Sequence, residues 1–209
     1  MKRNLLPCPK LIVSIAALMT ASTAVGDQIV FDNLASPTTS SNSISSVAYW
    51  AQGFKAPDID SYLSAVTLNV RNDNAATGIF TVQLFYGLGS VPTLLATLSG
   101  PANPQSGLTT FVPPSDLPLE AGQTYWVSAY ATSAYDPSQF YGWSIADNAP
   151  TVGTGYGRAF RQIGGGWDLQ TGPGDLSLQV RTTFVPEPTT FGLLSASSIL
   201  FSARRRRDA

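Results

Sequence analysis

The stretch from residue 27 to residue 185 contains no cysteine and no histidine. The chain has a single cysteine, Cys8, which precedes this stretch. These absences exclude a disulfide, a thiol nucleophile, an imidazole base and any metal site built from His or Cys ligands. With no disulfide to constrain it, the stretch must depend on its hydrophobic core for stability.

Basic residues are also scarce between residues 27 and 185. This stretch holds five Lys and Arg residues against eleven Asp and Glu residues, a net charge of −6. Proteins bind nucleic acid largely by neutralising phosphates with Lys and Arg. We therefore expect no nucleic-acid partner.

No window of the central stretch shows the apolar stripe of a helix, whereas alternation typical of strands recurs. In residues 64–70, Val66, Leu68 and Val70 alternate with polar neighbours, which is the pattern of a strand with one buried face. Residues 80–86 repeat this pattern after a segment rich in turn-forming residues. The two runs predict a hairpin.

Further short runs with β-branched or aromatic residues follow, separated by Gly, Pro and Asn. They cover residues 94–98, 109–112, 125–131, 140–145, 156–163 and 176–182. Regularly spaced strands of this kind predict an all-β fold. We expect one domain over residues 27–185, a single antiparallel β-sandwich of jelly-roll type.

Two segments of unusual composition interrupt this pattern. Residues 36–46 hold eight hydroxyl side chains in eleven positions and offer little to bury, so we expect a surface loop or flexible arm, with O-glycosylation left open. Residues 153–174 are rich in glycine, but Trp167 and Asp168 follow the triple glycine where a phosphate-binding loop would continue into a helix. A β-turn or bulge is therefore the better interpretation.

The first 26 residues have the layout of a secretory signal peptide. Basic residues come first, an apolar stretch follows over residues 11–19, and small residues come last. Cleavage after Ala24 and cleavage after Gly26 both fit this layout. We expect export by the general secretion machinery and removal of the signal helix by signal peptidase.

The last 24 residues combine three features in a fixed order. Pro186 and Pro188 hold the chain extended, which keeps this segment open to a protease. Residues 189–203 are uncharged and would span about 22 Å as a helix, against a hydrocarbon core of roughly 30 Å. Four arginines then act as a cytoplasmic stop under the positive-inside rule. The alternative is a short core helix with a basic end, or a nucleic-acid-binding tail.

This tail resembles the PEP-CTERM sorting segment of exported bacterial proteins. The matching residues are Pro186, Glu187, Pro188, Arg204, Arg205, Arg206 and Arg207. The resemblance implies an exosortase-type membrane protease as partner. It also implies transient anchoring in the inner membrane by a short C-terminal helix, followed by release to the cell surface or the medium.

The central region resembles a second family of exported domains, called choice-of-anchor R. The similarity covers most of residues 27–181 and is carried by six blocks in order. They are residues 48–54, 63–70, 81–85, 95–100, 119–127 and 141–143. The resemblance implies export on a C-terminal anchor, and it supplies no catalytic residue.

Aromatic residues late in the sequence suggest a binding role. Tyr141, Trp143 and Trp167 are candidate carbohydrate-binding residues, with Tyr135 and Tyr156 nearby in the sequence, because exposed rings serve as platforms for sugars. The alternative is that these rings fill the core, where large aromatic side chains contribute most burial.

Two sets of acidic residues are candidate Ca²⁺ ligands or glycosidase carboxylates: Asp58 with Asp60, and Asp147 with Asp168 and Asp175. Neither set has the dense, regular spacing of a Ca²⁺ loop, and the sequence does not give the distance between carboxylates that a glycosidase pair requires. Turn capping is the preferred interpretation. We expect no metal and no cofactor.

These observations predict a non-catalytic, exported protein of the cell envelope or extracellular matrix. A carbohydrate-binding module or surface adhesin, with a polysaccharide as partner, is the first alternative. A secreted glycan-active enzyme is the second.

Overall fold

In the computed structural model, described for residues 26–73, 76–87, 92–134, 136, 139–162, 165–170 and 174–184, all regular structure is β-structure. The strands are β1 (Gln28–Asp32), β2 (Thr38–Ile44), β3 (Ala48–Lys55), β4 (Ser61–Asp73), β5 (Phe80–Tyr86), β6 (Thr93–Leu98), β7 (Gly107–Phe111), β8 (Leu117–Leu119), β9 (Thr124–Ala131), β10 (Phe140–Ala146), β11 (Gly155–Gln162), β12 (Trp167–Gln170), β13 (Asp175–Leu176) and β14 (Leu178–Phe184). Residues 1–25 of the expected signal segment (1–26), residues 185–209, which include the whole expected tail (186–209), and Tyr135 lie outside the described residues.

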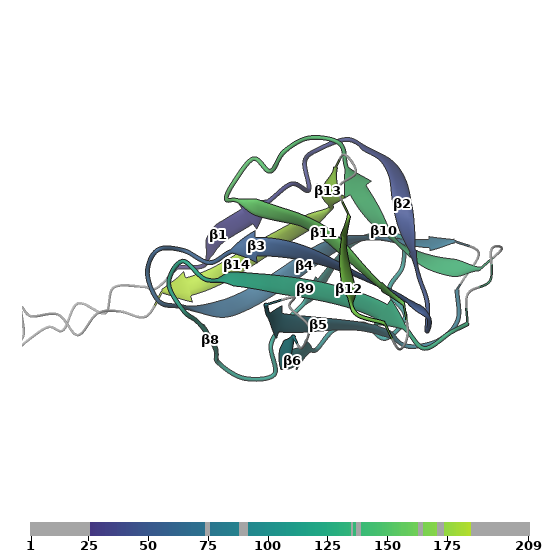
Figure 1. Ribbon diagram of the computed structural model, residues 1–209, viewed down its shortest axis with the longest axis horizontal. Helices are drawn as coiled ribbons and strands as arrows, with labels where there is room; N and C mark the ends of the chain where they lie inside the picture. The colour runs from purple at the N-terminus through teal and green to yellow at the C-terminus, as the bar shows by residue number, and fades with distance from the viewer. Residues whose placement is uncertain are drawn as a thin grey trace, which may run out of the picture.

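The strands form two sheets in which every pairing between strands is antiparallel (Figure 1). Sheet A has eight strands in the order β1-β14-β4-β10-β13, with β2 paired to β10 and both β7 and β8 paired to β4. Sheet B has six strands in the order β12-β11-β3-β9-β5-β6. The predicted all-β, antiparallel class is confirmed.

One hydrophobic core draws on both sheets. Along β5, Phe80, Val82 and Leu84 are buried and point inward, as their alternation predicts. The ring of Phe80 contacts two rings of sheet A, at centroid distances of 5.9 Å to Phe111 and 5.3 Å to Tyr141. Two antiparallel sheets that share a core in this way are consistent with a β-sandwich.

The predicted hairpin of residues 64–70 with residues 80–86 is wrong. The first run lies in β4 of sheet A, and the second is β5 of sheet B, so the chain crosses between the sheets there. Alternation shows that each strand has one buried face, but it does not say which sheet the strand joins.

The prediction of a loop at residues 36–46 is also wrong. Most of this segment forms β2, which pairs with β10 from Tyr141↔Ile44 to Ala146↔Thr38. Ile44 is completely buried, and Ser45 is nearly so. Thr and Ile suit a strand, and the edge of β10 supplies the hydrogen-bonding partner that hydroxyl-rich composition alone does not reveal.

The predicted strand at residues 176–182 is interrupted at Ser177, where the chain changes partner. Before this residue β13 pairs with β10, and after it β14 pairs with β4. The main-chain groups of Ser177 itself bond to both neighbours. Its N–H donates to the Ser144 carbonyl at 2.8 Å, and its carbonyl accepts from the Asn69 N–H at 3.2 Å. Ser177 therefore bonds to β10 on one side and to β4 on the other, at the point where these two strands diverge.

Buried side chains replace the missing ladder bonds around this junction. Asn33 donates to the Leu176 carbonyl at 3.0 Å and accepts from the Leu178 N–H at 2.6 Å. Gln52, on β3 of the opposite sheet, accepts from the Leu176 N–H at 2.7 Å. Asn33 and Gln52 are both fully buried, so these bonds satisfy main-chain groups that water cannot reach.

Candidate functional site

Two of the three predicted sugar-binding residues lie in the core. Tyr141 and Trp143 are both on β10, and neither has any exposed surface. The indole N–H of Trp143 donates to the Ser177 carbonyl at 2.8 Å, and burial raises the pKa of Tyr141. A sugar platform needs an exposed ring face, so these two rings match the alternative interpretation, in which they fill the core.

The third residue, Trp167, is half-buried on the edge strand β12 of sheet B. Its ring lies 6.3 Å from the ring of Phe85 on β5. Adjacent strands are about 4.8 Å apart, so β12 and β5, four places apart, would be about 19 Å apart in a flat sheet. Sheet B must therefore curl, and Figure 1 shows β11 and β12 crossing in front of its other strands.

Small residues on the outer face of sheet B make this curl possible. Ser128, Ala51 and Ala159 are neighbours on β9, β3 and β11 by register. They point away from the core, yet each is at most 1% exposed. The rings of Phe85, Trp126 and Trp167 pack with the two alanines in a second hydrophobic cluster. A larger side chain in this row would keep those rings apart.

Further rings extend this cluster in both directions. Tyr49 and Tyr130, paired across β3 and β9, have centroids 5.0 Å apart and are both half-buried. At the other end, a Cβ at Gly53 would meet Tyr156 at 2.9 Å and the Trp126 indole at 3.0 Å, so glycine is needed for both side chains to lie there. We call the whole set the outer aromatic face: Tyr49, Phe85, Trp126, Tyr130, Tyr156 and Trp167.

Polar groups also lie among and beside the rings of the outer aromatic face. Ser128 Oγ and Trp167 Nε1 are buried and have no hydrogen-bond partner among the described residues. Arg161, in register with Tyr49 and Trp167, donates from Nε to the Gly165 carbonyl at 2.9 Å. The six strands of sheet B contain one acidic residue, Asp168, which is paired with Phe160 on β11. Because successive residues of a strand belong to opposite faces, this pair does not share the face of Ala159 and Arg161.

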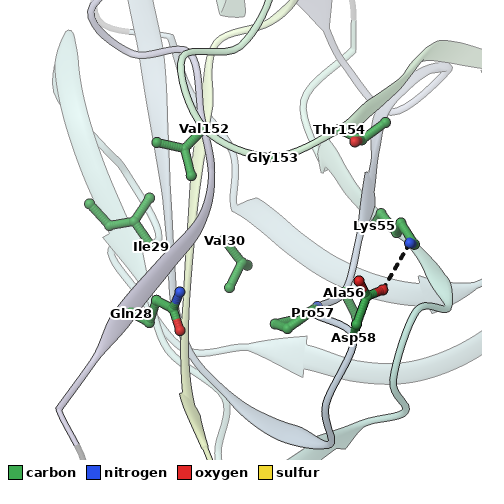
Figure 2. A pocket seen from close by; sticks show the side chains of 10 residues that line it. All are labelled: Gln28, Ile29, Val30, Lys55, Ala56, Pro57, Asp58, Val152, Gly153 and Thr154. Atoms are coloured by element: carbon green, nitrogen blue, oxygen red, sulfur yellow. Dashed lines mark hydrogen bonds and ion pairs between the residues drawn. The ribbon is translucent and has the colours of Figure 1, made fainter.

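A cavity of about 270 Å³ lies between β1 and the end of β3 (Figure 2). The segment 152–154 connects the two strands, because Asp32 N–H donates to the Val152 carbonyl and Lys55 N–H donates to the Thr154 carbonyl, both at 3.1 Å. Figure 2 shows Lys55 and Asp58 at one side, where they form an ion pair of 2.9 Å. The hydrogen bond to Asp58 raises the pKa of Lys55.

A second cavity, of about 170 Å³, brings together two of the acidic residues that the sequence offered as candidate ligands. Asp147 and Asp175 line it with Asn148, Ala149, Gly157 and Gly174. Burial raises the pKa of Asp175, while a hydrogen bond from Gln52 and the charge of Arg158 lower it. Asp168 is exposed on β12 and does not line this cavity, so the set of three carboxylates is not assembled.

The other acidic pair has local partners. Asp58 pairs with Lys55, and Asp60 accepts from the Ala121 N–H at 3.0 Å. Across the described ranges, no group of three or more His, Cys, Asp or Glu side chains could hold a metal ion.

No protein-family model matches the chain, and no curated protein sequence is significantly similar to it. In the part of the chain that the structure describes, no helix is long and apolar enough to cross a membrane.

Proposed function

We propose that the chain is a non-catalytic, exported protein of the cell envelope or extracellular matrix, sorted by an exosortase-type protease. The observation that carries this proposal is the order of three elements at the C-terminus. Pro186-Glu187-Pro188 comes first, the uncharged segment 189–203 follows, and Arg204 to Arg207 come last. A jelly-roll type of sandwich and a relationship to choice-of-anchor R domains are part of the same proposal.

The strand arrangement supports a folded domain from which the signal segment and the C-terminal tail are both cleaved. The first and last strands, β1 and β14, are antiparallel neighbours, with Gln28 paired to Thr182. The chain therefore enters and leaves the β-structure at the same end (Figure 1). A tail that leaves from one end of the fold can be reached by a membrane protease without unfolding the sheets.

The intact mass of the protein from each cell fraction of its native host tests this proposal. We expect a species that begins near residue 25 or 27 and ends near Pro186, found at the cell surface or in the medium. Replacing Pro186, Glu187 and Pro188 with alanine should leave the arginines attached and the protein in the inner membrane. Ser195→Ala is the matched control within the tail. An unchanged C-terminus and destination in the triple variant would refute the sorting mechanism.

A carbohydrate-binding module or surface adhesin is the second candidate. The observation that favours it is the outer aromatic face, which places exposed Tyr156 and half-buried Tyr49 and Tyr130 on one side of sheet B. The two candidates are compatible, because a sorted matrix protein can also bind a polysaccharide.

A further inference from the structure

We propose that the outer aromatic face binds a polysaccharide built of pyranose rings, with Tyr49 and Tyr130 as its principal contacts. This inference rests on the second candidate function and replaces the residues first predicted for it. Trp167 is kept from the first set, whereas Tyr141 and Trp143 are buried in the core.

The shape of the face suits a chain of sugars. A pyranose ring has an apolar face of C–H groups and a rim of hydroxyls, so it packs on an aromatic ring and bonds to polar groups at the edge. Tyr49 and Tyr130 form a cross-strand pair at 5.0 Å, and Arg161 and Trp167 continue their row onto β11 and β12. Tyrosine and arginine suit such a row because each combines a flat surface with hydrogen-bonding groups.

Two polar atoms on this face have no partner within the described residues. Ser128 is 1% exposed, and its Oγ has no hydrogen-bond partner among these residues. The Nε1 atom of Trp167 is also buried and has no hydrogen-bond partner among them. Leaving such groups unpaired is unfavourable, because each has lost its hydrogen bonds to water without gaining a partner. Both atoms lie on the face that carries the proposed row, and a sugar hydroxyl has the chemistry to pair with either, as donor to Ser128 Oγ or as acceptor from Trp167 Nε1.

The distribution of charge favours a polysaccharide over a phosphate-rich ligand. The segment from residue 27 to residue 185 has a net charge of −6, yet the row of Tyr49, Tyr130, Arg161 and Trp167 contains no acidic residue. A neutral glycan can approach this row without charge repulsion, and the carboxylate of an acidic glycan could pair with Arg161. One arginine is too few for a nucleic acid, whose affinity comes from several phosphate contacts.

Affinity electrophoresis of the full-length protein in gels containing hydroxyethyl cellulose or polygalacturonate tests the proposal. We expect retardation by at least one of these polymers, and about tenfold or greater weakening in the double variant Tyr49→Ala/Tyr130→Ala. Tyr62→Ala is the control, because Tyr62 is a half-buried tyrosine on β4 of the opposite sheet. Circular dichroism checks the fold of each variant, and Arg161→Ala provides a second test if the double variant is unfolded.

Three outcomes would overturn the inference, and they separate it from the functions above. Retardation that survives in a folded double variant would place sugar binding elsewhere and leave the second candidate intact. An equal loss in Tyr62→Ala would also reject this site. No retardation by either polymer would overturn both this site and the carbohydrate-binding form of the second candidate, whereas the sorting proposal is judged by the mass of the processed protein.

Discussion

The indole N–H of Trp143 donates a hydrogen bond of 2.8 Å to the carbonyl of Ser177, the residue at which the last part of the chain passes from β10 to β4. Trp143 is also paired with Val70 on β4, so it lies where β4 and β10 are still adjacent. Its ring therefore occupies the point at which the two strands separate to admit β13 and β14. A residue first considered for sugar binding is thus a central packing element of sheet A.

Replacing Trp143 with phenylalanine should destabilise the protein by about 2–4 kcal/mol. The change removes the bond to Ser177 and leaves a cavity beside the junction. Urea unfolding measures the free energy. Trp50→Phe is the control, because Trp50 donates a comparable bond to the Ser43 carbonyl at 3.1 Å but is only half-buried. A larger loss in Trp50→Phe than in Trp143→Phe would contradict the assigned role.

Asn33→Ala should cost about 2–4 kcal/mol in the free energy of unfolding. Its amide satisfies both the Leu176 carbonyl and the Leu178 N–H, and an alanine would leave these buried groups without that partner. Thermal or urea unfolding measures the effect, with exposed Asn148→Ala as the control. Equal stability of the two variants would show that the Asn33 bonds contribute nothing net.

Gly153→Ala should be more destabilising than Gly87→Ala. Both glycines have positive φ, +79° and +69°, so each substitution carries a backbone cost of about 1–2 kcal/mol. A Cβ at Gly153 would also clash with the Val30 carbonyl oxygen, whereas a Cβ at Gly87 meets no atom of the described residues within 4 Å. The difference in unfolding free energy between the two variants therefore measures the steric part. No difference would mean that the 152–154 segment moves without cost.

The carboxyl of Asp175 should make stability depend on pH. Burial raises its pKa above the ordinary value of 3.8, so the folded protein holds this proton more tightly than the unfolded chain. The stability from this group is complete below pH 3.8 and is lost as the pH rises through the folded pKa. The free energy of unfolding of the wild type, relative to Asp175→Asn, should therefore fall as the pH is raised above 3.8. A difference that rises with pH would reverse the assigned direction.

Much of the strand content could be predicted from local pattern. The predicted runs 94–98, 109–112, 125–131, 140–145 and 156–163 correspond to β6, β7, β9, β10 and β11, because alternating or β-branched residues fit a half-buried pleated surface. Strand β2 was missed because its polar residues carry little alternation, and its pairing depends on the edge of β10. Strands β1, β3, β8 and β12 were not predicted either. β8 and β12 have only three and four residues, and β3 shows no alternation because consecutive residues on both of its faces are buried.

The position of the aromatic rings could not be predicted in the same way. Tyr141 and Trp143 are separated by one residue, so the sequence predicts that they share a face of β10. It does not predict whether that face is buried or exposed. Both faces of a strand can carry aromatic rings, and the face that packs against the opposing sheet is the one buried away from water. The outer aromatic face depends further on the curl of sheet B, which brings Trp167 to Phe85 across four strand positions.

Alternation along single strands was enough to predict the β class, and the absence of Cys and His excludes disulfide, thiol and imidazole chemistry from residues 27–185. The neighbours of each strand, the division of the last strand pair at Ser177 and the exposure of each ring became known only from the folded arrangement. Alternation is a local property of one strand. Register, curl and burial arise from contacts between residues far apart in the chain, such as Asn33 with Leu178.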